Sequence, residues 1–190
     1  MCHWLRREGK FWGALRSADE GIAEETRALG CRRCGGPLHR ADYPRKPRGI
    51  PGEVEEAYSR RRSFCCGHCR RRATPPSVRF LGRKVYVGER VIAASVAWDD
   101  LLAAGVPRRT VRRWLVWWRK VVPATDFWQT MRALFRRPVA EAQLPRALVE
   151  RYGIPGSDSF ECVLRFVAPL TTESASYVRV DVLHAEDGGL

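Results

Sequence analysis

The sequence has no long hydrophobic run, and this absence sets the first limits on the protein. No apolar stretch among its 190 residues approaches the roughly 18 residues that a membrane-spanning helix needs. Three of the first eight residues are charged, and this start does not resemble a hydrophobic secretion signal. The seven cysteines are odd in number, which does not suit a simple disulfide framework. We therefore expect a protein of the reducing cytoplasm, with no membrane partner.

Four of the cysteines form two pairs with the spacing of a metal site. Cys31 and Cys34 enclose two residues, and so do Cys66 and Cys69, about thirty residues further along. Two intervening residues let a tight turn aim both sulfurs at one ion, and four thiolates complete the tetrahedron of a structural Zn²⁺ site. The sequence therefore predicts a zinc ribbon with one structural Zn²⁺, bound by Cys31, Cys34, Cys66 and Cys69.

Three alternatives to this hypothesis stay open. Cys65 would replace Cys66 if the second gap held three residues, although a two-residue gap matches the first pair. His39 and His68 lie near the cysteines, but a histidine beside four complete thiolates more often supports the site than binds the ion. A CxxC pair can also be a redox dithiol of the thioredoxin type. No βαβ pattern surrounds Cys31, however, and this alternative leaves the second pair unexplained.

Positive charge is the second strong feature of the sequence. The formal net charge is +13, and arginine far outnumbers lysine. Residues 31–84 carry 15 Lys or Arg against 4 Asp or Glu, residues 107–137 carry 9 against 1, and residues 138–190 carry 4 against 8. Guanidinium groups match phosphate oxygens and release condensed counterions on binding. We expect nucleic acid as the partner, because arginines that merely solvate the surface would not explain the acidic final stretch.

The pattern along the chain predicts an α+β protein made of small modules, in which a four-cysteine zinc ribbon precedes a mainly helical domain. Four segments are expected: an N-terminal helical segment (1–30), the ribbon with a long basic loop (31–87), a helix-turn-helix-like domain (88–137), and short helices with an acidic tail (138–190).

Several elements can be placed within these segments. Ser17 has the properties of a helix N-cap, and Gly30 those of a helix stop. Residues 43–52 contain three prolines and two glycines and are expected to form a loop. Partial alternation over 78–87 indicates a strand or an extended link, and alternation over 177–182 indicates a strand.

The segment after residue 88 predicts helices around a tight turn. Apolar residues of the first helix have helical spacing up to Gly105, and Pro107 opens the second. A third helix is expected from residue 125 or 126 to 136. In the second helix an apolar stripe faces a core while arginines occupy the other side. This is typical of a recognition helix, although an ordinary amphipathic helix would give the same pattern. The candidate nucleic-acid contacts are Arg108, Arg109, Arg112, Arg113 and Arg119 in this helix, and Arg70, Arg71 and Arg72 after the last ribbon cysteine.

Three stretches carry a resemblance to a known family: Cys31-Arg-Arg-Cys34-Gly35, Cys66-Gly-His-Cys69-Arg70-Arg71-Arg72, and the turn and helix over 105–114. In this order they resemble the N-terminal DNA-binding region of bacterial insertion-sequence transposases of the DDE type, over roughly residues 31–120. The resemblance implies metal ligation by the four cysteines and DNA contact by the helix after the turn. The ribonuclease-H-like core of that family needs three carboxylates around two metal ions, and too few residues follow position 122 to build it.

Together these features predict a zinc-stabilised protein that binds double-stranded DNA and has no catalytic site or small-molecule substrate. It would act as an accessory factor or regulator related to a mobile element, associated with a bacterial nucleoid. One alternative is a protein–protein interaction module whose ribbon docks onto a transposase or the transcription machinery. A CxxC thiol oxidoreductase and an RNA-binding protein are the others.

Overall fold

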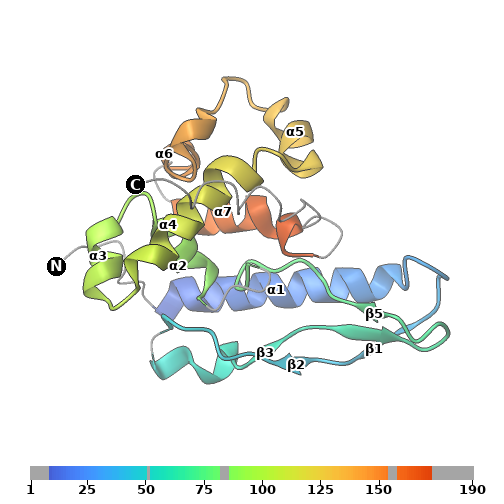
Figure 1. Cartoon of the computed structure of the whole chain (residues 1–190). Coiled ribbons are helices and arrows are strands. Elements are labelled where there is room, and N and C mark those ends of the chain that lie inside the picture. Colours follow the sequence, from blue (N-terminus) through green and yellow to red (C-terminus); the bar gives the residue numbers. More distant parts are fainter. Residues whose placement is uncertain (1–8, 51, 82–85, 154–157, 173–190) are drawn as a thin grey trace.

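In the computed structural model of this protein, the structure is described for residues 9–50, 52–81, 86–153 and 158–172. This part of the chain is α+β, with helices and very small sheets (Figure 1). Its α-helices are α1 (Gly9–Leu29), α2 (Gly88–Ala93), α3 (Trp98–Ala103), α4 (Arg108–Val116), α5 (Asp126–Arg132), α6 (Arg146–Arg151) and α7 (Ser159–Val167). Its strands are β1 (Leu38–Arg40), β2 (Tyr43–Pro44), β3 (Arg60–Arg61), β4 (Phe64–Cys66) and β5 (Arg72–Ala73). Short 3-10 helices are η2 (Gly52–Val54), η3 (Glu56–Tyr58), η5 (Glu141–Gln143) and η6 (Ala168–Thr171), and a π-helical turn, η4 (Trp117–Val121), continues α4.

The longest helix, α1, corrects the prediction that a helix starts at Ser17. Ser17 is an exposed residue in the middle of α1. Phe11, Trp12 and Leu15 are buried and add a full turn of apolar contacts before it, and these contacts rather than a cap hold the first half of the helix. The predicted end is confirmed, because Gly30 follows the last turn with a φ of 73°.

The strands form two small antiparallel sheets beside α1. In the first sheet the order is β1-β4-β5, with Leu38 opposite Cys66. In the second, β2 pairs with β3 and places Tyr43 opposite Arg61. The loop predicted for residues 43–52 therefore begins with a strand, which accommodates Pro44 because each strand of a two-stranded sheet has a free edge.

Two hydrophobic clusters lie along α1. The main core contains Trp12 together with Phe80, Trp118 and Phe160, and includes side chains from each of α2, α3, α4, α6 and α7. The small core lies at the other end of α1 and consists of Ala23, Cys31, Leu38, Phe64 and Cys66. The main core thus draws residues from all four predicted segments. The segment boundaries themselves stay predictions.

A buried polar network joins the two regions. Asp19 of α1, only 4% exposed, accepts hydrogen bonds from Ser77 Oγ (2.7 Å), the Val78 backbone N–H (2.6 Å) and Arg79 Nε (2.7 Å). Arg61 of β3, 2% exposed, donates hydrogen bonds to the carbonyls of Phe80 (3.1 Å), Pro75 (3.0 Å) and Thr171 (3.4 Å). Buried charges of this kind are stable only when fully bonded, so the network fixes the small sheets against the helical region.

Other elements depart from the prediction in detail. The helix expected up to Gly105 is two helices, α2 and α3, with a turn between them. The third helix, α5, ends at Arg132 rather than at residue 136. Residues 78–81 and 86–87, the described part of the predicted strand 78–87, contribute only an isolated parallel bridge at Tyr86. The strand predicted for 177–182 lies outside the described residues. None of the helices described is long and apolar enough to cross a membrane.

Candidate metal centre and basic surfaces

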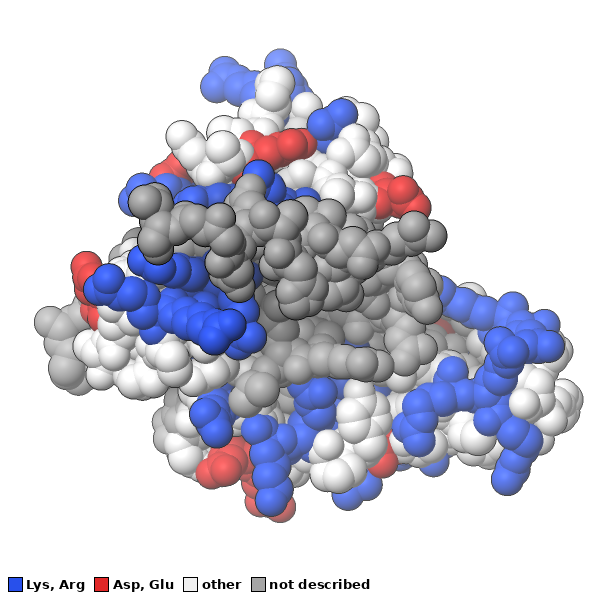
Figure 2. Space-filling model, viewed as in Figure 1, with Lys and Arg blue, Asp and Glu red and all other residues white. Residues whose placement is uncertain are grey.

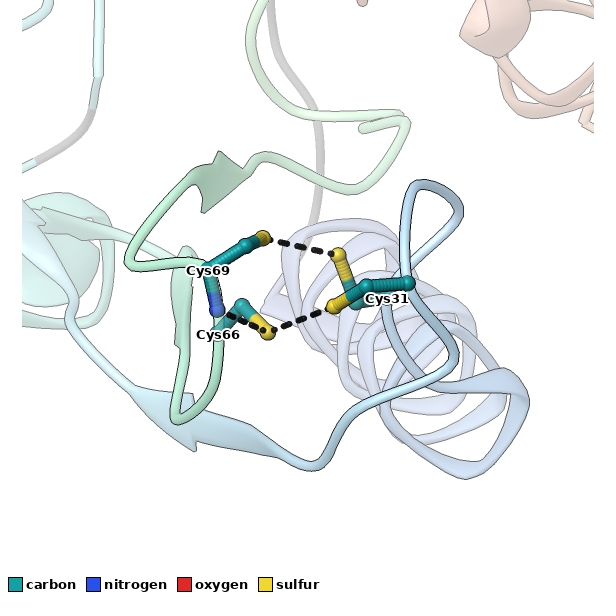
Figure 3. Close-up of side chains that lie close together, drawn as sticks. Cys31, Cys66 and Cys69 are labelled. Atoms are coloured by element: carbon teal, nitrogen blue, oxygen red, sulfur yellow. Dashed lines mark hydrogen bonds between the residues drawn. The ribbon is translucent and has the colours of Figure 1, made fainter.

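The four predicted ligand cysteines meet at one point. The sulfur atoms of Cys31, Cys34, Cys66 and Cys69 all lie within 4.8 Å of one another. Cys31 and Cys34 come from the turn after α1, while Cys66 ends β4 and Cys69 follows in the next turn. Figure 3 shows Cys66 and Cys69 facing Cys31 across the gap between these two turns. Residues that are far apart in the sequence are thereby brought into one cluster.

Each turn is shaped by the backbone around its cysteine pair. In the first turn, the N–H of Gly35 donates to the Cys31 carbonyl (2.8 Å), and Gly35 has a φ of 69°. In the second, the N–H of Cys69 donates to Cys66 Sγ (3.4 Å). A Cβ atom added at Gly36 would lie only 2.6 Å from Nδ1 of His68. Only glycine at this position therefore allows the two turns to pack this closely.

Two of the sulfur–sulfur distances are close to those around a tetrahedral ion. With zinc–sulfur bonds of about 2.3 Å, the edges of a zinc tetrathiolate are about 3.8 Å long. Sγ of Cys31 lies 3.6 Å from Sγ of Cys69, and Sγ of Cys34 lies 3.5 Å from Sγ of Cys66. The cysteines are free thiols in this arrangement. The cluster can therefore hold a metal ion, and an all-thiolate donor set suits Zn²⁺ well.

Electrostatics also favour a cation at this position. Backbone N–H groups of Cys69 and His68 help to lower the pKa of Cys66 to about 6. The pKa of Cys69, in contrast, is raised to about 11. A hydrogen bond from the Arg71 backbone lowers it, but burial and contacts with the other three thiols outweigh that effect. Four thiolates at these separations repel one another, so a divalent cation is needed to hold all four in the charged form.

The alternative ligands lie beside the cluster rather than in it. Cys65 Sγ donates a hydrogen bond to the Arg70 carbonyl (3.4 Å) and is not among the clustered sulfurs. His39 is opposite Cys65 in the sheet, and its Nε2 approaches Gly67. His68 packs on the first turn as described above. Within the described residues, the four clustered cysteines are the only group of potential ligands that lie together.

The predicted turn before the arginine-rich helix is a tight helix ending. The N–H of Gly105 donates to the Leu102 carbonyl, and the N–H of Val106 donates to the Leu101 carbonyl, both at 2.9 Å. Gly105 has a φ of 77°. These are the two hydrogen bonds of a Schellman motif, and Leu101 and Val106, the residues that usually make its hydrophobic contact, are both buried. α4 therefore leaves α3 in a fixed direction.

The arginines predicted to contact nucleic acid in this helix all face solvent. Val111 and Trp114 are the buried residues of α4, and they turn its opposite face outward. Figure 2 shows a dense group of basic side chains where α4 lies. Among the described residues, none of these arginines makes an ion pair or a side-chain hydrogen bond. The exposed residues are Arg108, Arg109, Arg112, Arg113 and Arg119, with Lys120 beside them.

The arginines after Cys69 are exposed but differ in their contacts. Arg70 and Arg71 make no side-chain hydrogen bond, ion pair or ring contact within the described structure. Arg72 instead donates to the Ala41 carbonyl (2.9 Å) and Ser63 Oγ (2.8 Å), and its guanidinium lies over the ring of Tyr43. Arg72 therefore has a structural role in holding β5 to the turn after β1, whatever else it contacts.

Sequence reasoning missed two further exposed arginines, Arg32 and Arg33, which lie between the first two cysteines. Their position inside a CxxC pair was a signal, because a turn that points its sulfurs inward points the intervening side chains outward. Sequence reasoning also could not identify Arg61 and Arg79 as buried, because no local sequence feature distinguishes them from the neighbouring exposed arginines.

Comparison with known proteins assigns no family. No protein-family model, no curated protein and no solved structure matches this chain. The resemblance to transposase DNA-binding regions therefore stays a prediction that depends on the cysteine spacing, the arginines and the turn before α4.

Proposed function

We propose that this chain is a zinc-stabilised DNA-binding protein, an accessory factor or regulator without a catalytic site of its own. In this proposal Cys31, Cys34, Cys66 and Cys69 hold one structural Zn²⁺, and α3 and α4 act as a helix-turn-helix-like pair. The observation that carries the proposal is the row of exposed, unpaired arginines on α4.

The contrast with other exposed arginines supports this proposal. Many of those pair with a nearby glutamate: Arg27 with Glu24, Arg132 with Glu141, Arg146 with Glu150, and Arg165 with Glu161. The α4 arginines have no such partner in the described structure. The first turn of α4 contains no acidic residue either. Positive charge near a helix N-terminus opposes the helix dipole, so these arginines do not serve the stability of α4. An external polyanion accounts for them.

The proposed zinc site acts as a scaffold. Four thiolates leave no open position for substrate or water, which is the arrangement of structural rather than catalytic zinc. The ion would hold together two turns that share only a small hydrophobic core. It would thereby fix the sheet whose arginines flank it.

The proposal is tested by replacing the α4 arginines. A variant with Arg108, Arg109, Arg112 and Arg113 changed to Ala is compared with the wild type for binding to a labelled 24-base-pair duplex, by fluorescence anisotropy at several salt concentrations. Loss of phosphate contacts should weaken binding at low salt and reduce the slope of log K against log salt by roughly 2 to 4.

The matched control changes Arg27, Arg132, Arg146 and Arg165 to Ala, which removes the same formal charge from residues that already have carboxylate partners. It should affect binding much less. If the wild type has no affinity for duplex DNA at about 50 mM salt, where phosphate contacts bind best, the proposal fails. Equal loss in both variants would also contradict it, since binding would then depend on overall charge alone.

A further inference from the structure

The metal centre is surrounded by a second group of unpaired arginines. Arg32 and Arg33 lie in the first cysteine turn, and Arg70 and Arg71 follow the second. All four are exposed, and none makes an ion pair in the described structure. We refer to these four residues as the knuckle arginines. A zinc tetrathiolate carries a charge of about −2, so these side chains exceed what is needed to neutralise it.

The knuckle arginines and α4 lie at opposite ends of α1. The N-terminal half of α1 packs in the main core, through Phe11, Trp12 and Leu15, together with Trp114 of α4. Its C-terminal end leads through Gly30 directly into the first cysteine turn. A helix of 21 residues is about 30 Å long, so the two arginine groups at its ends lie a distance of this order apart.

Basic side chains gather at two places on one face of the molecule. In the view of Figure 2, basic side chains gather where α4 lies and again at the far end, beside β1 and β5. The separation is also fixed, because the buried contacts of Asp19 with Arg79, and of Arg61 with three carbonyls, tie α1 and β3 to the helical region. The two groups therefore form a rigid pair of cationic surfaces.

We propose that the two arginine groups bind one DNA duplex at positions about one helical turn apart, with α4 at one groove and the knuckle arginines on phosphates one turn away. The argument is geometric. A turn of B-DNA is about 34 Å long, so equivalent surfaces of the duplex recur at nearly the spacing that α1 imposes. A duplex of this length is stiff and cannot fold back to meet surfaces at another spacing. This inference depends on the proposed function and specifies its partner as duplex DNA longer than one turn.

Duplex length gives the first measurement. Binding of the wild type is compared on 10- and 24-base-pair duplexes of matched sequence, by fluorescence anisotropy at fixed salt. A 10-base-pair duplex is about 34 Å long, which is close to the spacing itself and leaves no room for the full footprint of both groups, whereas 24 base pairs cover both footprints. Because the second contact is intramolecular once the first has formed, affinity should rise at least about tenfold with length.

A knuckle variant gives the second measurement. Changing Arg32, Arg33, Arg70 and Arg71 to Ala should abolish most of the increase in affinity from the 10- to the 24-base-pair duplex. A several-fold increase should remain, because a longer duplex offers more overlapping positions at which the protein can bind. On the 10-base-pair duplex the variant should bind nearly as tightly as the wild type if α4 provides the stronger contact. Zinc content and thermal unfolding of the variant are measured to show that it is still folded. The variant with Arg27, Arg132, Arg146 and Arg165 changed to Ala is the charge-matched control, and it should keep the increase in affinity with length.

The outcomes separate this inference from the proposed function. If the wild type binds DNA but the knuckle variant shows the same gain with length, the two-surface inference is wrong while DNA binding stands. The same conclusion follows if the wild type binds both duplexes equally. If the protein binds single-stranded RNA with a similar dependence on the knuckle arginines but not duplex DNA, the inference is also overturned, since its spacing argument applies to B-form duplex alone.

Discussion

At the scale of single residues, the position of Cys65 shows how strand geometry selects a ligand. Successive side chains of a strand point to opposite faces, so Cys65 and Cys66 cannot both face the metal centre. Cys66 is fully buried and pairs with Leu38 on the face of the small core. Cys65 points the other way and bonds the Arg70 carbonyl. The preference for Cys66 that the spacing suggested has a physical basis in the sheet.

This alternation predicts different outcomes for the two neighbouring cysteines. Cys66→Ser should weaken zinc binding by roughly 100-fold or more, because one of four thiolates is lost from a site worth about 10–16 kcal/mol. Cys65→Ser should retain wild-type affinity. Zinc stoichiometry and competition with a chromophoric chelator measure both. Loss of zinc from the Cys65 variant with retention in the Cys66 variant would assign the ligands the other way.

Asp42 provides a pH-dependent contact between the two small sheets. Its carboxylate accepts hydrogen bonds from Arg62 (2.7 Å) and the Ser63 backbone N–H (3.1 Å). Partial burial raises the pKa of Asp42. The two hydrogen bonds and the charges of Arg62 and Arg40 lower this pKa by more, so the net shift is downward. A carboxyl with a depressed pKa stabilises the fold above its unfolded pKa, near 4, and this contribution is lost as pH falls through the folded value.

Asp42→Asn should therefore lower the free energy of unfolding by about 1–3 kcal/mol at pH 7 and by less at pH 3, where the wild-type carboxyl is nearer to protonation. Urea unfolding at the two pH values measures the difference. Asp99→Asn is the control, because Asp99 is exposed in the first turn of α3 and should contribute only a few tenths of a kcal/mol. An equal loss at both pH values would indicate that Asp42 acts through shape rather than charge.

At the scale of elements, the two glycine helix stops were predicted correctly, whereas the start of α1 was not. Gly30 and Gly105 both follow the helices they were expected to end, because a positive φ after the last turn is a local requirement. The start of α1 was misplaced because it depends on Phe11, Trp12 and Leu15 packing against a core formed by distant segments. The buried position of Asp19 in α1 is likewise set by a distant residue, Arg79, sixty residues later. Neither relation can be seen in a local window.

The turn between α3 and α4 can be tested through its glycine. Gly105→Ala should destabilise the fold by about 1–2 kcal/mol. A methyl group there meets no atom within 4 Å, so the cost is the strain of a non-glycine residue at a φ of 77°. Gly21→Ala is the matched control, since this site in α1 is equally open but helical, and the change should stabilise by about 0.5–1 kcal/mol. Thermal or urea unfolding distinguishes the two, and stabilisation of both variants would disprove the strain at Gly105.

At the scale of the whole molecule, the two hydrophobic clusters predict that the metal matters unequally along the chain. The small core around Cys31 and Cys66 contains few side chains, while the main core is much larger. The described tryptophans lie in the main core or pack against it. The sequence indicated the four cysteines that cluster and an α+β composition through spacing and period, but it could not show that one core gathers side chains from all four predicted segments.

Removal of zinc should therefore loosen the cysteine-bearing sheet and leave the helical region folded. After chelation, amide hydrogen exchange should become fast over residues 31–40 and 63–73, while tryptophan emission keeps the wavelength of a buried indole. Readdition of zinc should restore protection. A red shift of the emission together with loss of helical circular dichroism on chelation would instead mean that the metal supports the entire fold.

The buried side chain of Arg61 has a consequence for how this protein can be divided. All three carbonyls that it bonds, at Pro75, Phe80 and Thr171, follow it in the chain. A truncated fragment that stopped just beyond the last cysteine turn would keep the arginine and discard every one of its acceptors. The cysteine-bearing segment therefore cannot be transferred to another protein by itself. A domain-swapping experiment must include residues 75–80 and 171 as well.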